Sequence, residues 1–114
     1  MDIMIDDQAR GIGVVRLTGR LDLLSAADVR QGLAKAMADG HRRLVVDLAK
    51  VSFIDSSGLG ALVSGLKAAR LGGGDLRIAQ PNEQARVILE LTTLNRVLKP
   101  YATVGEALAG YVAS

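Results

Sequence analysis

The stretch that decides the fold is Val45-Val-Asp-Leu-Ala-Lys-Val-Ser-Phe-Ile-Asp-Ser-Ser-Gly-Leu-Gly-Ala-Leu62. It starts inside the nearly continuous apolar run 44–48, which is typical of a central strand covered on both faces. A short apolar link, 51–54, follows. From about Ser57, apolar residues recur at helical spacing, which predicts an amphipathic helix that ends at the three glycines 72–74. A buried strand that leads directly into a helix is a building unit of α/β domains.

On either side of this stretch, the sequence predicts further strands and helices. The β-branched run 12–18 predicts a strand that ends at Gly19, and alternating isoleucines before it predict a hairpin partner. Residues 76–79 predict another short strand. Capping boxes predict helices that begin at Ser25 and Thr103, and Pro81-Asn82 opens a further helix. The side chains expected to face the core from the last two helices are Val87, Ile88, Leu91, Leu94, Ala107, Leu108, Tyr111 and Val112.

This order of elements predicts one α/β domain over residues 1–114. We expect a mixed, mostly parallel β-sheet with an antiparallel edge hairpin and about four helices, in which right-handed crossovers join the parallel strands. A chain of 114 residues has room for one hydrophobic core. No internal repeat or linker divides it.

The composition excludes several classes of function. The chain has no cysteine, which excludes disulfides, thiolate catalysis and cysteine-based metal sites. The net charge is +2 and aromatic residues make up 3 %, so the clustered cations and stacking rings of a nucleic-acid binder are missing and we expect no nucleic-acid partner. The sequence has no apolar run long enough to span a membrane, and its acidic start is unlike a secretion signal, so we expect a cytoplasmic protein.

The run Asp55-Ser-Ser-Gly-Leu-Gly60 is the strongest candidate for a functional site. In an open α/β sheet, the carboxyl ends of the strands and the helix starts beside them form the usual functional rim. Here two hydroxyls stand beside a carboxylate, in front of the positive end of a helix dipole. By spacing alone, this run is equally an ordinary N-cap cluster, with glycines that serve packing. One N-cap residue suffices for a helix, however, and each interior glycine costs about 1 kcal/mol, which favours a role beyond helix stability. The missing side chains of Gly58 and Gly60 would also let the backbone of another molecule approach closely.

On these residues the whole chain resembles the STAS domain family, the sulfate-transporter and anti-sigma-factor-antagonist domain. It is most similar to the small stand-alone bacterial members. The resemblance lies in Gly19-Arg-Leu-Asp22, in Val46-Asp-Leu48 and above all in Phe53-Ile-Asp-Ser-Ser-Gly-Leu-Gly60. The C-terminal segments 91–98 and 106–108 also look like the closing pattern of the family.

The resemblance implies an anti-sigma factor antagonist that works by partner switching. Such a protein binds an anti-sigma factor, itself a serine kinase, when unphosphorylated and releases it when phosphorylated; a serine phosphatase resets it. The match places the phosphate acceptor at Ser56, with Ser57 as the helix cap and also as the alternative acceptor, because both hydroxyls are sterically plausible. Arg20 departs from the acidic or polar residue of many relatives. The partner surface that the resemblance implies consists of Asp22, Asp55, Ser56, Ser57, Gly58, Leu59 and Gly60.

Other readings of the sequence are weaker. Ser64-Gly-Leu-Lys67 fits an acyl-enzyme motif but lies inside the second predicted helix, without the companion motifs. His41 lies in a polar turn, and Asp22, Asp47 and Asp55 lack a recognisable metal-ligand spacing. We therefore expect no catalytic residue, no metal and no cofactor. The alternative that remains open is a STAS interaction module that regulates a non-sigma target: a signalling enzyme, a stress-sensing assembly or a lipid-transport complex.

Overall fold

The computed structural model describes residues 1–112, except for the side chain of Val112. The predicted core position of that side chain and the last two residues of the predicted domain, 113 and 114, lie outside the described part. The elements are, in chain order, β1 (Asp2–Asp7), β2 (Ile12–Leu21), α1 (Ala26–Ala38), β3 (Arg43–Ile54), α2 (Ser56–Leu71), β4 (Asp75–Ala79), α3 (Glu83–Leu91), the 3-10 helix η1 (Leu94–Arg96), β5 (Pro100–Tyr101) and α4 (Val104–Val112).

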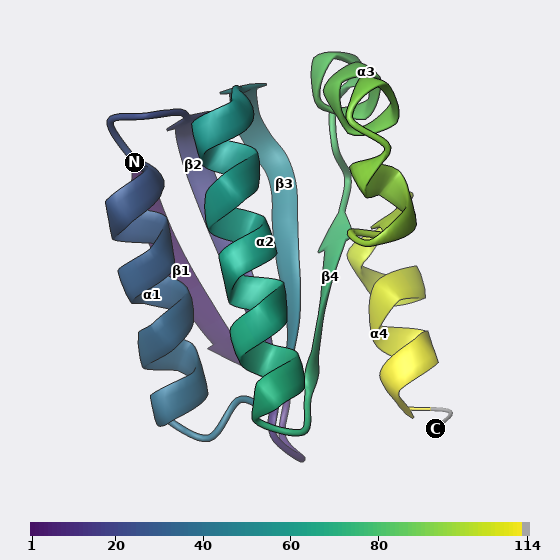
Figure 1. Cartoon of the computed structure of the whole chain (residues 1–114). Helices are drawn as coiled ribbons and strands as arrows, with labels where there is room; N and C mark the ends of the chain where they lie inside the picture. The colour runs from purple at the N-terminus through teal and green to yellow at the C-terminus, as the bar shows by residue number, and fades with distance from the viewer. Residues whose placement is uncertain (113–114) are drawn as a thin grey trace.

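The five strands form one sheet in the order β1-β2-β3-β4-β5. β1 and β2 pair antiparallel, and the other neighbouring strands pair parallel. α1 and α2 lie side by side over one face of the sheet (Figure 1), whereas α4 packs against β3, β4 and β5 on the other face and α3 packs against β3. The predicted mixed sheet with an antiparallel edge hairpin and four helices is confirmed.

The central strands are buried on both faces, as the apolar run of β3 predicts. Alternate side chains of β2 and β3 point to opposite sides, because successive residues of a strand face opposite ways. Val15 and Val46 belong to the large core under α1 and α2. Val14 and Val45 belong to a smaller core that α4 closes with the buried Tyr111.

Both long strands run further than the sequence predicts. β2 does not end at Gly19, and the predicted link 51–54 is part of β3. The two strands stay paired as far as Leu21 and Ile54. Two shifts in the register of their pairing accommodate the extra residues of β3, and one of these shifts follows Gly19, which has a φ of +120°. The extra pairing carries the ends of β2 and β3 to the same rim of the sheet.

The predicted inward face of α3 is partly wrong. Val87 and Leu91 are exposed, at 47 % and 79 %, whereas Ala85 and Leu89 are buried. The rotation of the helix is set at its start, because Asn82 accepts the N–H of Ala85 at 2.8 Å and its amide nitrogen donates to two carbonyls of β3 at 3.3 Å. Of the other two predicted residues, Ile88 and Leu94 are half-buried against the core.

The helix caps follow the predictions in part. Asn82 caps α3, and the Thr103 hydroxyl accepts the N–H of Glu106 at 3.0 Å before α4. The capping box predicted at Ser25 is wrong: the Ser25 hydroxyl makes no cap bond. It donates instead to the carbonyl of Arg20 at 2.7 Å and accepts the N–H of Asp22 at 3.0 Å, which fastens the loop between β2 and α1.

Candidate functional site

The start of α2 is organised by Asp55. Its carboxylate accepts the N–H of Gly58 at 2.9 Å, and its carbonyl accepts the N–H of Leu59 at 3.0 Å. Asp55 is therefore the N-cap, and the prediction of Ser57 as the cap is wrong, because Ser56 and Ser57 are the first two residues of the helix. A charged acceptor at this position also interacts favourably with the helix dipole.

Asp55 also joins α2 to the loop between β2 and α1. The second oxygen of its carboxylate accepts the N–H of Leu23 at 3.2 Å, and its own N–H donates to the carbonyl of Leu21 at 3.2 Å. One residue thus holds the helix start, the end of β2 and the following loop together. The predicted functional rim is a single hydrogen-bonded unit.

The two glycines of the first turns have different roles. A Cβ atom at Gly58 would overlap the backbone carbonyl of Leu21, so the space that Gly58 leaves is filled by the protein's own chain. At Gly60 the nearest atom to such a Cβ belongs to the Arg30 guanidinium, at 3.9 Å, and the residue is half-exposed. Of the two positions, Gly60 leaves room for another molecule.

The two candidate hydroxyls differ in exposure. Ser56 is exposed and Ser57 is half-buried. Within residues 1–112, neither hydroxyl makes a hydrogen bond to the protein. As the first residues of the helix, both also carry a backbone N–H without an intrahelical partner. An added negative charge would therefore meet free donors and the positive end of the dipole.

Asp22 is engaged in its own loop. Its carboxylate accepts the N–H groups of Leu24 and Ser25 at 3.1 and 3.3 Å and the Nε of Arg20 at 3.3 Å. Desolvation acts in the opposite direction, but these hydrogen bonds prevail and lower the pKa of Asp22 below its ordinary value. The carboxylate that the sequence places on the partner surface thus also shapes that surface.

Two exposed leucines lie in the loop that Asp55 joins to the start of α2, and sequence reasoning missed them. Leu23 and Leu24 are 72 % and 89 % exposed. Their backbone N–H groups are bonded to Asp55 and Asp22, so the loop is held with both side chains outward. Apolar loop residues show no periodicity, which is why the sequence pattern alone does not single them out.

A second group that sequence reasoning missed supports the end of β3. β4 pairs with β3 only as far as Asp47, so Val51–Ile54 have no strand on that side. The side-chain amide of Gln84 replaces it: its oxygen accepts the N–H of Ile54 at 3.0 Å and its nitrogen donates to the carbonyl of Ile54 at 2.8 Å. α3 thereby fixes the strand end from which the candidate serines follow.

Arg20 adds a cation to this rim. Its guanidinium lies 4.4 Å from the ring centroid of Phe53 on β3, and its side chain is 61 % exposed.

The residues weighed for catalysis or metal binding lie in other settings. His41 bridges the carboxylate of Asp7 and the carbonyl of Ala36, both at 3.1 Å. Asp47 accepts from Arg16 and Gln80 at 2.8 and 2.9 Å. Across residues 1–112, no three His, Cys, Asp or Glu side chains are grouped to hold a metal ion.

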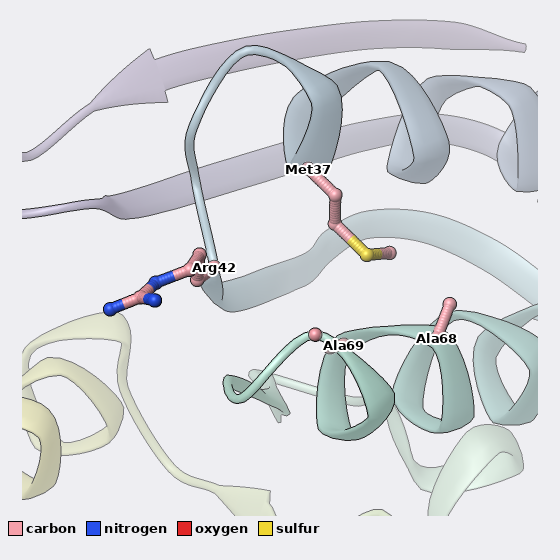
Figure 2. A pocket seen from close by; sticks show the side chains of 5 residues that line it. Met37, Arg42, Ala68 and Ala69 are labelled. Atoms are coloured by element: carbon pink, nitrogen blue, oxygen red, sulfur yellow. The ribbon is translucent and has the colours of Figure 1, made fainter.

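A cavity of about 190 Å³ lies between the C-terminal parts of α1 and α2, away from the serines. Its lining includes Met37, Ala68 and Ala69, and the guanidinium of Arg42 points away from Met37 (Figure 2). This lining offers no acid, base or nucleophile. None of the described helices has the length and apolar character needed to cross a bilayer.

Comparisons with known proteins agree on one family. A Thermotoga maritima protein assigned as an anti-sigma factor antagonist is 38 % identical over 69 residues, which is 60 % of this chain; the match spans 61 % of the length of that relative. The anti-sigma F factor antagonist of Paenibacillus polymyxa is 28 % identical over 110 residues, 95 % of this chain and 94 % of the relative.

Two solved structures share the fold of this chain. The anti-sigma factor antagonist SpoIIAA in its unphosphorylated form superposes with a TM-score of 0.83 at 22 % identity, over 99 % of this chain and 98 % of that one. The phosphorylated form of SpoIIAA from Bacillus superposes with a TM-score of 0.74 at 21 % identity, over 96 % and 99 %. The sequence model of the STAS domain matches residues 4–107, which include β2, β3 and the whole serine-bearing rim. The chain belongs to the STAS domain family.

Proposed function

We propose that this protein is a cytoplasmic, non-enzymatic anti-sigma factor antagonist that works by partner switching. It binds an anti-sigma factor serine kinase when unphosphorylated and releases it when Ser56 is phosphorylated, and a serine phosphatase restores the binding form. The observation that supports this proposal most directly is an exposed serine at the start of α2, in a chain that matches an anti-sigma F factor antagonist over 95 % of its length.

The exposure of the hydroxyls favours Ser56 over Ser57 as the acceptor. A kinase must bring the γ-phosphate in line with the attacking oxygen, so the hydroxyl has to be accessible. Ser56 is exposed, whereas Ser57 is half-buried. The free helix N–H groups would accommodate the new phosphate without unfolding α2.

Some residues of the predicted partner surface are accessible to a partner, and the others hold these accessible residues in place. Ser56, Ser57 and Gly60 are accessible, and we add the exposed Leu23 and Leu24 as apolar anchors. Asp22 and Asp55 hold the loop that presents these leucines. Gly58 and Leu59 are buried and set the path of the chain beneath the contact surface.

The switch follows from charge and desolvation. The unmodified surface presents a neutral hydroxyl beside two leucines, which suits an apolar partner pocket with a few polar groups. A phosphate adds about −1.5 to −2 charges, and burying it against such a pocket requires desolvation without a matching cation. A loss of about 3 kcal/mol in binding free energy weakens the affinity roughly 150-fold, which is enough for a switch.

The test combines the protein with the anti-sigma serine kinase of its own organism and ATP. We expect mass spectrometry to find one phosphate, on Ser56, and binding measurements to show a loss of roughly 100-fold in affinity on phosphorylation. Ser56→Ala should abolish labelling, with Ser57→Ala as the matched control that keeps it. Ser56→Glu should weaken binding less than phosphate does, because it adds one charge.

Two results would contradict the proposal. One is phosphorylation on Ser57 alone, and the other is a phosphorylated form that binds the kinase as tightly as the unmodified form. Capture of a transporter ATPase or another signalling enzyme in place of a kinase would favour the alternative of a STAS module with a non-sigma target.

A further inference from the structure

A polar cavity of about 240 Å³ opens beside β4, on the segment that leads from η1 to β5. The cavity is lined by Asp75, the first residue of β4. Asp75 pairs with Arg43 at the start of β3, whereas the serine-bearing rim lies at the end of β3. The charged and aromatic residues that line the cavity are Arg70, Asp75, Arg77, Arg96, Lys99 and Tyr101.

The charge around this cavity is unbalanced. Four of the lining side chains are cationic, and Asp75 is the one acidic group among the described residues of the lining. The carboxylate of Asp75 accepts a hydrogen bond from the Nε of Arg70 at 3.3 Å, so its negative charge is paired with one of the four cations. Like charges around one cavity repel each other, and an anion in the cavity would relieve that repulsion.

Arg77 is held in place before any ligand arrives. Its guanidinium lies 4.0 Å from the ring centroid of Tyr111 and 5.4 Å from that of Tyr101, and Nη1 donates to the carbonyl of Ala107 at 2.9 Å. A Cβ at Gly110 would overlap this guanidinium, so the glycine gives it room against α4. A positioned guanidinium loses little entropy when it binds an oxyanion.

Two further cations, Arg96 and Lys99, line the cavity. Lys99 places its Nζ 5.4 Å from the ring centroid of Tyr101, and Arg96 projects from η1 as an exposed residue. Guanidinium groups match phosphate oxygens with paired donors, and ammonium groups bind them as point charges. The volume lies below the range of about 300–1,000 Å³ typical for drug-sized ligands, which favours a ligand of one or two phosphoryl groups.

We propose that this cavity is a binding site for a small phosphate-bearing anion. The site is independent of the serine switch, since it shares no residue with the rim of Asp22, Asp55 and Ser56. Its ligand is recognised through phosphoryl oxygens by Arg70, Arg77, Arg96 and Lys99.

The test is calorimetric titration of the whole protein with inorganic pyrophosphate, inorganic phosphate and citrate at about 0.1 M ionic strength, at which exposed charges more than about 10 Å apart are largely screened. We expect saturable binding of one pyrophosphate per chain, weaker binding of phosphate, and weaker binding of citrate despite its three charges. The double variant R96Q/K99Q should lose at least about tenfold in pyrophosphate affinity, because each charge-assisted hydrogen bond contributes strongly. Both residues are exposed, so the fold should persist, which circular dichroism checks.

A matched control and a variant of opposite sign make the test decisive. R30Q/K67Q removes the same charge from exposed positions outside the cavity and should leave affinity within about twofold. Asp75→Asn removes the carboxylate and should strengthen binding. No saturable binding at about 5 mM pyrophosphate, equal losses in both double variants, or citrate bound as tightly as pyrophosphate would each overturn the proposal.

Discussion

Charged side chains bond to the backbone in both the serine-bearing rim and the region under α4, but they are acceptors in the rim and donors under α4. At the rim, the carboxylates of Asp22 and Asp55 accept backbone N–H groups of a loop and a helix start. Under α4, the guanidiniums of Arg43 and Arg77 donate to the carbonyls of Tyr111 and Ala107. In both regions a charged side chain forms hydrogen bonds with the protein's own backbone. At the rim, the exposed hydroxyl of Ser56 makes no hydrogen bond to the described residues, so under the proposed function a phosphate there adds a new charge to this surface.

The largest expected effect is a difference in stability between alanine substitutions at two glycines of the rim, Gly58 and Gly60. In Gly58→Ala, the new methyl group overlaps the carbonyl of Leu21, and the backbone must shift. We expect the free energy of unfolding to fall by about 3 kcal/mol, measured by urea denaturation. Gly60→Ala is the matched control: with 3.9 Å to the nearest atom, it should be neutral or stabilise by up to about 1 kcal/mol. Equal stability of the two variants would mean that the contact between Gly58 and the carbonyl of Leu21 does not decide the effect.

The next effect concerns the face under α4. Arg77→Met removes a guanidinium stacked on Tyr111 and bonded to Ala107, and we expect the free energy of unfolding to fall by about 2 kcal/mol. Lys67→Met, at an exposed position on α2, should stay within about 0.5 kcal/mol. If the two variants denature alike, Arg77 does not fasten α4 to the sheet.

A smaller effect is expected at the carboxylate of the rim. Asp55→Ala removes the cap of α2 and the acceptor for Leu23, and should cost about 1 kcal/mol. Hydrogen exchange should quicken at the amides of Leu23 and Gly58. Asp28→Ala, an exposed residue in the first turn of α1, is the control and should change stability by a few tenths of a kcal/mol. Unchanged exchange at Leu23 would show that the loop does not depend on Asp55.

The smallest effect appears at alkaline pH, under α4. Burial raises the pKa of the Tyr111 hydroxyl, which donates to the carbonyl of Leu44 at 2.8 Å, above its ordinary value of 10.0. The folded state therefore holds this proton after the unfolded state has lost it. Stability from this source is full below pH 10 and falls as the pH rises through the unfolded and then the folded pKa. At pH 10 the loss should be about 0.4 kcal/mol, and Tyr111→Phe should remove this part of the pH dependence in urea denaturation.

Sequence periodicity predicted most of the fold, because local pattern sets which elements form and which face is buried. The apolar run of β3 and the alternation in β2 are examples. It missed β5, because two residues are too short to leave a pattern. It misplaced the faces of α3, because that helix has two apolar stripes and the contacts of Asn82 with β3, distant in sequence, choose between them.

At the candidate site, the sequence predicted which segment begins the helix but not which of its residues caps the helix and which are exposed. Three successive polar residues, Asp55, Ser56 and Ser57, can each cap a helix, so the pattern alone does not select the cap. The close packing of Gly58 on Leu21 joins residues 37 positions apart in the chain, and no local pattern records it. No local pattern in the sequence predicts the exposure of Leu23 and Leu24 either.

The outer edges of the sheet bear on how copies of this protein avoid one another. β5 spans two residues and begins with Pro100, which has no N–H to offer to an incoming strand. At the other edge, β1 carries Asp2 and Asp7 as exposed residues, and their like charges oppose pairing with a second copy of the same strand. Both edges of the sheet therefore disfavour edge-to-edge aggregation.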